Sequence, residues 1–164
     1  MTTTWTDFVT AAPHIAGIFT RRHAAAGNLC LLATTRSDGY PRISPMEPRV
    51  FAGELLLAGM PGTTKFADLR RDPRFCLHTA TVDTQVTEGD AKLFGTVRHL
   101  PDVELHRAFA EQVYAEIGLD LRGQAFDDFF AADITGASSV EVVGNHLEIT
   151  VWKPGRAERV VRKD

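Results

Sequence analysis

Residues 63–74 read TTKFADLRRDPR and hold a two-turn helix between a loop and a strand. Phe66 and Leu69 are three residues apart, so both can face inward from a helix over residues 65–71. Asp72-Pro73 ends this helix, because a proline disfavours the helical backbone in the residue before it. The residues on either side of this helix have the pattern of short strands. The sequence therefore predicts one short helix set into a β-rich region.

Short apolar runs bounded by turn residues indicate the strands. Strands are expected over residues 29–35, 41–51, 55–59, 74–81, 91–99, 134–143 and 146–153, with a short one at 159–161. The connections between the first three are too short for a crossover helix, which predicts an antiparallel meander. Pro45 and Pro48 cannot donate hydrogen bonds to a neighbouring strand, so the strand over 41–51 should be irregular, bulged or at an edge there.

Three more helical regions are expected. Thr4 and Asp7 form a capping box that opens the first, and Pro13 divides that region into two short helices. Pro101 stands near the start of a long amphipathic helix, and residues 126–130 predict a short one. The chain has no internal repeat and no linker, so one domain over residues 1–164 is expected. Short strands with a few inserted helices predict a mainly β (α+β) barrel with helices at its openings.

The composition excludes several classes of protein. With 164 residues, 44% hydrophobic and 24% charged, the chain has ordinary globular composition. Its net charge of -3 offers no overall attraction to nucleic acid or anionic lipid, so neither partner is expected. No apolar run approaches the ~20 residues of a membrane helix, and the absence of a secretion signal favours the cytoplasm. The cysteines and histidines show no metal-ligand spacing, so no metal site is expected.

The strongest local signal for a binding site is residues 59–65, GMPGTTK, which run from a strand end through a loop into a helix. Free backbone N–H groups and the helix dipole make such a helix start a site for anions. Thr63 and Thr64 can add hydroxyl donors, and Lys65 adds a positive charge. The alternative is that one threonine caps the helix and Lys65 is an ordinary surface residue.

A second signal lies on the strand over 41–51. Arg42, Ser44 and Met46 share one face of this strand, and Ile43 and Pro45 share the other. A polar, cationic face in an apolar meander can line a site for a phosphorylated ligand, or it can simply face solvent at an edge. The chain has no GxSxG or HExxH motif. A phosphate site without acid–base machinery favours chemistry done by a cofactor.

Together these stretches resemble the pyridoxamine 5′-phosphate oxidase-like family of flavin-binding split β-barrels. The matching segments, in the family's order, are residues 31–35, 38–45, 55–59, 63–74 and 91–97. The resemblance implies an antiparallel split β-barrel with flanking helices, which forms a homodimer with the cofactor at the subunit interface. Val50, Phe51 and the segment 75–77 are candidate contributors to that interface.

The resemblance also implies positions for the cofactor. Residues Arg42, Ile43, Ser44, Pro45 and Met46 would lie along its ring and phosphate side, Ala58 and Gly59 would contact the ring through their backbone, and Thr63, Thr64 and Lys65 would hold its phosphate. The chain departs from the family at Glu47, where a lysine or arginine often stands, and at Ala58-Gly59, where some members have an aromatic-threonine pair.

The function implied is that of a flavin-dependent oxidoreductase that moves hydride to or from a small organic substrate. FMN is the favoured cofactor, and a deazaflavin of the F-420 type is the alternative, since Glu47 disfavours a strongly anionic tail. A non-catalytic flavin-binding protein and a haem-binding protein remain as further alternatives, the latter with His78, His99 or His146 as axial ligand. Trp152 is either a half-buried strand residue or a contact to the cofactor ring. No catalytic residue and no particular substrate are assigned.

Overall fold

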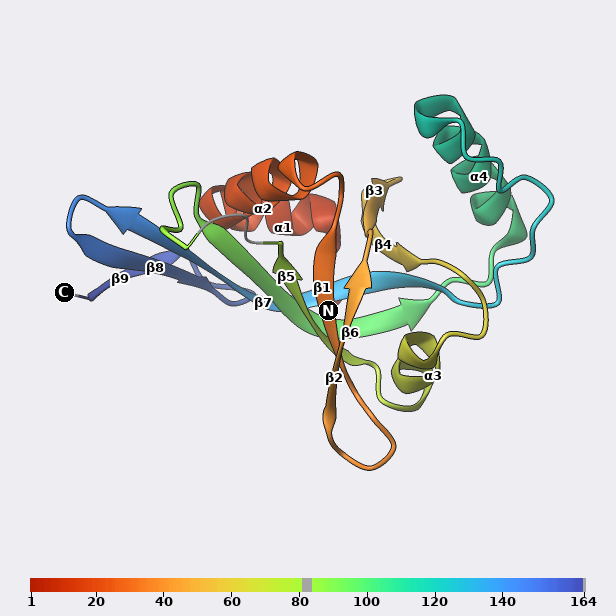
Figure 1. The fold of residues 1–164 in the computed structure, drawn as a ribbon, viewed down its shortest axis with the longest axis horizontal. Coiled ribbons are helices and arrows are strands. Elements are labelled where there is room, and N and C mark those ends of the chain that lie inside the picture. The colour runs from red at the N-terminus through yellow and green to blue at the C-terminus, as the bar shows by residue number, and fades with distance from the viewer. Residues whose placement is uncertain (81–83, 164) are drawn as a thin grey trace.

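The computed structural model describes residues 1–80 and 84–163 and is a mostly antiparallel β structure with four helices (Figure 1). The helices are α1 (Trp5–Ala11), α2 (Pro13–Ala25), α3 (Thr64–Arg71) and α4 (Val103–Ile117). The strands are β1 (Cys30–Thr35), β2 (Pro41–Met46), β3 (Arg49–Phe51), β4 (Glu54–Ala58), β5 (Arg74–Thr79), β6 (Asp90–His99), β7 (Phe129–Val143), β8 (His146–Trp152) and β9 (Arg159–Lys163).

The strands form one sheet in the order β2-β1-β5-β6-β7-β4-β3, and β8 and β9 extend it from β7. The long strand β7 joins the two parts, because its first residues pair with β4 and residues 137–143 pair with β8. Among the described residues no ladder joins β2 to β3, so the sheet is not closed. This architecture confirms the predicted α+β split barrel.

A β-bulge lets β6 bend against β7. The pairing register shifts between Phe94 and Gly95. A side chain cannot be accommodated at this point, since a Cβ atom on Gly95 would lie 1.9 Å from the carbonyl oxygen of Asp133. Gly95 is therefore required by the close approach of the β7 backbone.

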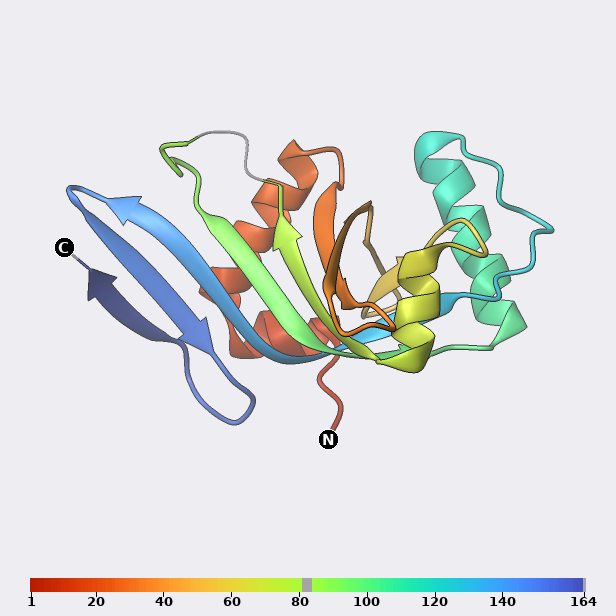
Figure 2. The same ribbon diagram turned by 60° about the horizontal axis from the view of Figure 1, so that its bottom comes forward.

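Helices α1 and α2 cover one face of the sheet and bury the main core (Figure 1, Figure 2). The predicted capping box is present, with Thr4 Oγ1 accepting from the backbone N–H of Asp7 and Asp7 Oδ2 accepting from that of Thr4. Pro13 stands in the first turn of α2, as expected for the start of a new helix. Phe8 and Phe19 are fully buried beneath these helices.

Helix α3 follows the prediction closely. Phe66 and Leu69 are both buried, and the ring of Phe66 stacks on that of Phe130 at 5.9 Å between centroids. Asp72 caps the C-terminal end, one residue before Pro73. Helices α3 and α4 lie at one end of the sheet, and β8 and β9 lie at the other (Figure 1, Figure 2).

Two predicted elements need correction. The strand expected over 41–51 is two strands, because Glu47-Pro48 separates the edge strand β2 from β3, which pairs with β4 instead. The short helix expected over 126–130 is wrong, since Phe129 and Phe130 begin β7 and pair with Ala58 and Leu57. Strand β5 ends at Thr79, and the expected end of that strand at Thr81 lies outside the described residues.

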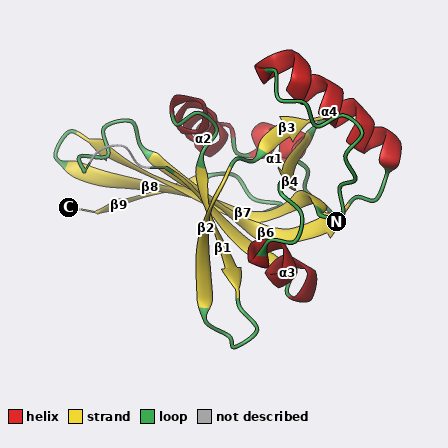
Figure 3. Ribbon diagram, turned by 45° about the vertical axis from the view of Figure 1, so that its right-hand side comes forward, coloured by secondary structure: helices red, strands yellow, loops and turns green. Residues whose placement is uncertain are grey.

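Helix α4 stands apart from α2, with β3 and β4 between the two helices (Figure 1, Figure 3). It forms a second, smaller apolar cluster, in which Phe109 and Val113 pack with Leu56 of β4 and Phe129 of β7. Gly118 ends the helix in the left-handed conformation at φ 71°.

Within the described segments, no helix is long and apolar enough to cross a membrane. The cytoplasmic location stays a prediction.

Candidate functional site

A cavity of about 380 Å³ lies where the end of β2, the end of β4, the start of α3 and the α4 region meet. We call it the Lys65 cavity. Five of the predicted site residues line it, namely Pro45, Met46, Ala58, Gly59 and Lys65. Its volume falls in the range of roughly 300–1,000 Å³ typical of small-molecule sites. Segments that are far apart in the sequence therefore form this cavity. In the sequence analysis, only the family resemblance had assigned them to one site.

The start of α3 contributes Lys65 to the lining of this cavity, whereas the predicted site residues Thr63 and Thr64 are not among its lining residues. Thr63 occupies the N-cap position but its side chain makes no capping hydrogen bond, and its Oγ1 atom is buried with no partner among the described residues. Thr64 begins the helix and is exposed. Lys65 places Nζ 5.6 Å from the ring centroid of Phe66, and no carboxylate in the described chain forms an ion pair with it. Unsatisfied donors and an unpaired cation at a helix N-terminus suit an anionic ligand.

Arg42 does not line the cavity, and its guanidinium is held by a buried carboxylate. Its Nε donates to Asp68 Oδ2 at 2.6 Å, and the same carboxylate accepts from Thr34 Oγ1 at 2.9 Å and from Arg71 Nη2 at 3.2 Å. Burial alone would raise the pKa of Asp68, but these hydrogen bonds outweigh it and hold that pKa below its ordinary value. The cluster ties α3 to β1 and β2, and so fixes the helix turn that bears Lys65.

The remaining predicted residues of β2 divide between the two faces of that strand as expected. Ser44 is half-buried on the face of Arg42 and the buried Met46, whereas Ile43 is 70% exposed on the opposite face. Neither Ser44 nor Ile43 lines the Lys65 cavity. Their contact with a cofactor stays a prediction.

The sequence analysis missed the apolar wall of the cavity. Phe109 and Val113 of α4, together with Leu119, Leu121 and Phe126 from the segment that follows, face the α3 side across the cavity. The helical spacing of Phe109 and Val113 indicated only a buried stripe. Nothing in the local sequence showed that residues 119–126 return to the end of β4.

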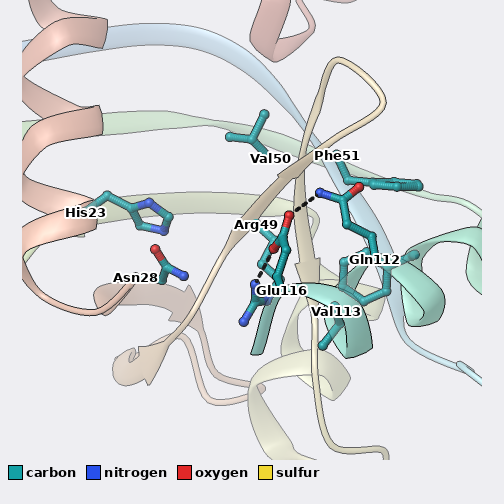
Figure 4. A pocket seen from close by; sticks show the side chains of 9 residues that line it. His23, Asn28, Arg49, Val50, Phe51, Gln112, Val113 and Glu116 are labelled. Atoms are coloured by element: carbon teal, nitrogen blue, oxygen red, sulfur yellow. Dashed lines mark hydrogen bonds and ion pairs between the residues drawn. The ribbon is translucent and has the colours of Figure 1, made fainter. Parts of the chain in front are cut away.

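A second, smaller cavity of about 190 Å³ lies between the end of α2, β3 and α4 (Figure 4). Arg49 lines both cavities and forms an ion pair with Glu116 of α4 at 3.3 Å. Burial lowers the pKa of His23, and the charge of Arg49 adds to this effect, although a hydrogen bond from the ring to the carbonyl of Pro48 opposes it. The Arg49–Glu116 pair thus joins α4 to β3.

The candidate haem ligands lie elsewhere. His78, His99 and His146 each already contact an oxygen, and no histidine is among the described residues that line the Lys65 cavity. The described part of the chain holds no cluster of side chains suited to a metal ion. Trp152 is 3% exposed and packs edge-on against Phe8 in the main core, so its ring does not face the cavity.

A protein family and several solved structures are similar to this chain. Residues 21–141 match the family model described as pyridoxamine 5′-phosphate oxidase. A comparison with curated proteins gives no match.

Among solved structures, a pyridoxamine 5′-phosphate oxidase-related, FMN-binding protein from Nostoc punctiforme is similar with a TM-score of 0.61 at 12% identity, over 93% of this chain and 95% of that one. An F420 reductase is similar with a TM-score of 0.51 at 20% identity, over 67% and 88%. A haem-binding protein from Mycobacterium smegmatis is similar with a TM-score of 0.57 at 18% identity, over 83% of this chain but only 57% of that one. At these identities the likeness shows the fold alone.

Proposed function

Because the chain belongs to the pyridoxamine 5′-phosphate oxidase family, we propose that it binds a flavin-type cofactor in the Lys65 cavity and acts as a flavin-dependent oxidoreductase. The observation that carries the proposal is the start of α3, where Lys65, which has no ion-pair partner in the described chain, lines a largely apolar cavity. The buried, unpartnered Oγ1 of Thr63 lies two residues earlier, at the N-cap of the same helix. That combination suits a ligand with an anionic group at one end and a flat apolar body at the other.

Residues in the cavity and beside it, at the start of α3, would fit both parts of FMN. Lys65, the hydroxyl groups of Thr63 and Thr64, and the free N–H groups of α3 would hold a phosphate. Ala58 contributes a methyl group and Gly59 contributes only backbone to the apolar part. We favour FMN over a deazaflavin of the F-420 type because Glu47 also lines the cavity and would repel a strongly anionic tail.

When bound, the flavin supplies the site that accepts or gives up hydride, and the side chains of this chain bind and orient. Lys65 would fix the phosphate and so set the position of the ring. The Asp68 cluster, including Arg42, would hold the α3 turn that bears Lys65. Phe109 and Phe126 would exclude water from the apolar side, where a small organic substrate would lie.

We also propose that two copies of the chain assemble through the sheet face opposite α1 and α2. Across β2, β1, β5 and β6 the pairing register places Ile43, Ala33, Cys76 and Phe94 in one row on this face. Ile43, Leu31 and Phe94 are 70%, 41% and 37% exposed. A second copy would cover these side chains, in an interface on the order of 2,000 Å² as is usual for permanent homodimers.

Three residues among the interface candidates from the sequence, Phe51, Phe75 and Leu77, pack within the same chain. Phe75 and Leu77 are buried in the main core, so Cys76 is the residue of segment 75–77 that points away from it. Phe51 packs edge-on against Phe109 of α4, whereas Val50 is 43% exposed and stays a candidate.

The absorbance spectrum of the purified protein, before and after addition of FMN or an F-420-type deazaflavin, tests the proposed function. A flavin spectrum that is shifted on binding supports it, and a single shifted deazaflavin band would replace FMN by the alternative cofactor. A Soret band together with no flavin binding would replace the proposal by haem binding. Bound flavin that no electron donor reduces would make the chain a flavin-binding protein without turnover.

A further inference from the structure

Three charged side chains line the Lys65 cavity, and they differ in whether a side chain of opposite charge pairs with them. Glu47, Arg49 and Lys65 are the charged side chains among its described lining residues. Arg49 is neutralised by Glu116 at 3.3 Å. Lys65 stands at the start of α3, where it faces the proposed phosphate. Glu47 is exposed at the end of β2, and no basic side chain of the described chain lies within ion-pair distance of it.

Once a phosphate occupies Lys65, the carboxylate of Glu47 is the charge left without a counterpart. The phosphate itself is negatively charged, so it adds to the negative charge of the Glu47 carboxylate in the cavity. The opposite wall carries no charged side chain, since α4 and the following segment contribute mainly apolar residues such as Phe109 and Phe126 there, with Gln124 as a neutral polar one. The free part of the cavity therefore combines an apolar wall with a negative rim.

We infer that the substrate of this site is an apolar small molecule that carries a positive charge, such as a protonated amine on an aromatic or aliphatic body. The apolar body would lie against the α4 wall, and the cationic group would lie near Glu47. An anionic substrate of the same size is disfavoured because it would meet both Glu47 and the phosphate. This inference rests on the proposed function.

Three naphthalene probes of nearly equal size test the inference on protein saturated with FMN. Naphthylmethylamine is cationic at pH 7, naphthylmethanol is neutral and naphthoate is anionic. Binding of each is measured by the change in flavin absorbance and fluorescence. We expect the cation to bind about three- to thirtyfold more tightly than the neutral probe, as one charge at ~6 Å in a partly hydrated site would give, and the anion to bind most weakly.

Variants of Glu47 separate charge from shape. Glu47→Gln should bring the cation and the neutral probe to similar affinities, and Glu47→Asp should retain the preference. Glu88→Gln makes the same change of charge on an exposed residue outside the cavity and should leave the preference as in the wild type.

The outcomes distinguish the two proposals. Wild-type protein that binds neither FMN nor the deazaflavin overturns the proposed function, and the inference falls with it. FMN-loaded protein that prefers the anion, or that binds all three probes equally, overturns the inference alone. A cation preference that survives Glu47→Gln also overturns it, because the charge would then come from another group.

Discussion

Replacing Asp68 by asparagine should destabilise the fold and change how its stability depends on pH. Asp68 is 3% exposed and accepts hydrogen bonds from Arg42, Thr34 and Arg71. Asparagine has nearly the same shape, but its amide nitrogen cannot accept a hydrogen bond and its side chain has no charge. The change therefore removes a buried counter-charge while leaving the volume of the side chain in place.

The size of the effect follows from the contacts. Hydrogen bonds between charged groups contribute about 1.5–3 kcal/mol each, and loss of one partner of a fully buried pair costs about 3–5 kcal/mol. The arginine side chains here are 29% and 42% exposed, so water can take over part of their solvation. We expect Asp68→Asn to lower the free energy of unfolding by about 2–3 kcal/mol at pH 7.

The pH dependence provides a second, independent readout. The pKa of Asp68 is lowered in the folded state, so its contribution to stability is complete above the ordinary carboxyl pKa of about 4 and is lost as the pH falls through the lower, folded value. The difference in unfolding free energy between wild type and variant should thus be constant from pH 7 to pH 5 and shrink below about pH 4.

Urea unfolding at several pH values measures both effects, followed by the emission of the core residues Trp5 and Trp152. Asp38→Asn is the matched control, because Asp38 pairs with Arg36 at 2.8 Å on the surface, where both side chains are about half exposed. The control should change stability by less than about 0.5 kcal/mol. A loss at Asp68 no larger than in the control, or a difference that does not shrink in acid, would refute this account of the cluster.

Three further changes test the fold, the core and the assembly. Gly95→Ala should cost about 3 kcal/mol or more in urea unfolding, because the new Cβ would lie 1.9 Å from the Asp133 carbonyl oxygen; a neutral effect would show that the bulge can relax. Trp152→Phe should cost about 1–3 kcal/mol through lost packing against Phe8 yet change FMN affinity less than about twofold, and a tenfold loss of affinity would place the ring at the cofactor. Ile43→Glu should shift the protein from dimer to monomer in analytical ultracentrifugation, and an unchanged dimer would exclude this face.

Local chemistry in the sequence was sufficient to predict much of the fold. The capping box at Thr4, the inward-facing pair Phe66 and Leu69, and the interruption by Pro48 depend on neighbours within a few residues. Such short-range effects can be recognised without knowing the rest of the structure. The assignment of a split barrel also needed the order of several such segments, which the resemblance supplied.

The features that were predicted wrongly or missed depend on contacts between residues far apart in the sequence. Phe129 and Phe130 have neighbours at helical spacing, but pairing with β4, some seventy residues earlier, makes them a strand. Leu121 and Phe126 line the cavity together with Ala58 and Gly59, which lie some sixty residues earlier in the sequence. The bond of Arg42 to Asp68 likewise depends on the packing of α3 against β2, and the contact of Arg42 with a cofactor stays a prediction. These features depend on tertiary contacts that no local pattern encodes.

Titration of FMN against the wild type and Lys65→Ala tests the central claim most directly. Lys153→Ala is the control, since Lys153 is exposed and outside the cavity. Loss of one charge-assisted hydrogen bond to phosphate, about 1.5–3 kcal/mol, should weaken FMN binding about 10- to 100-fold for Lys65→Ala, with an unchanged unfolding midpoint of the cofactor-free protein. Lys153→Ala should bind FMN as the wild type does. Equal affinity in the wild type and Lys65→Ala would contradict the placement of the cofactor in the Lys65 cavity.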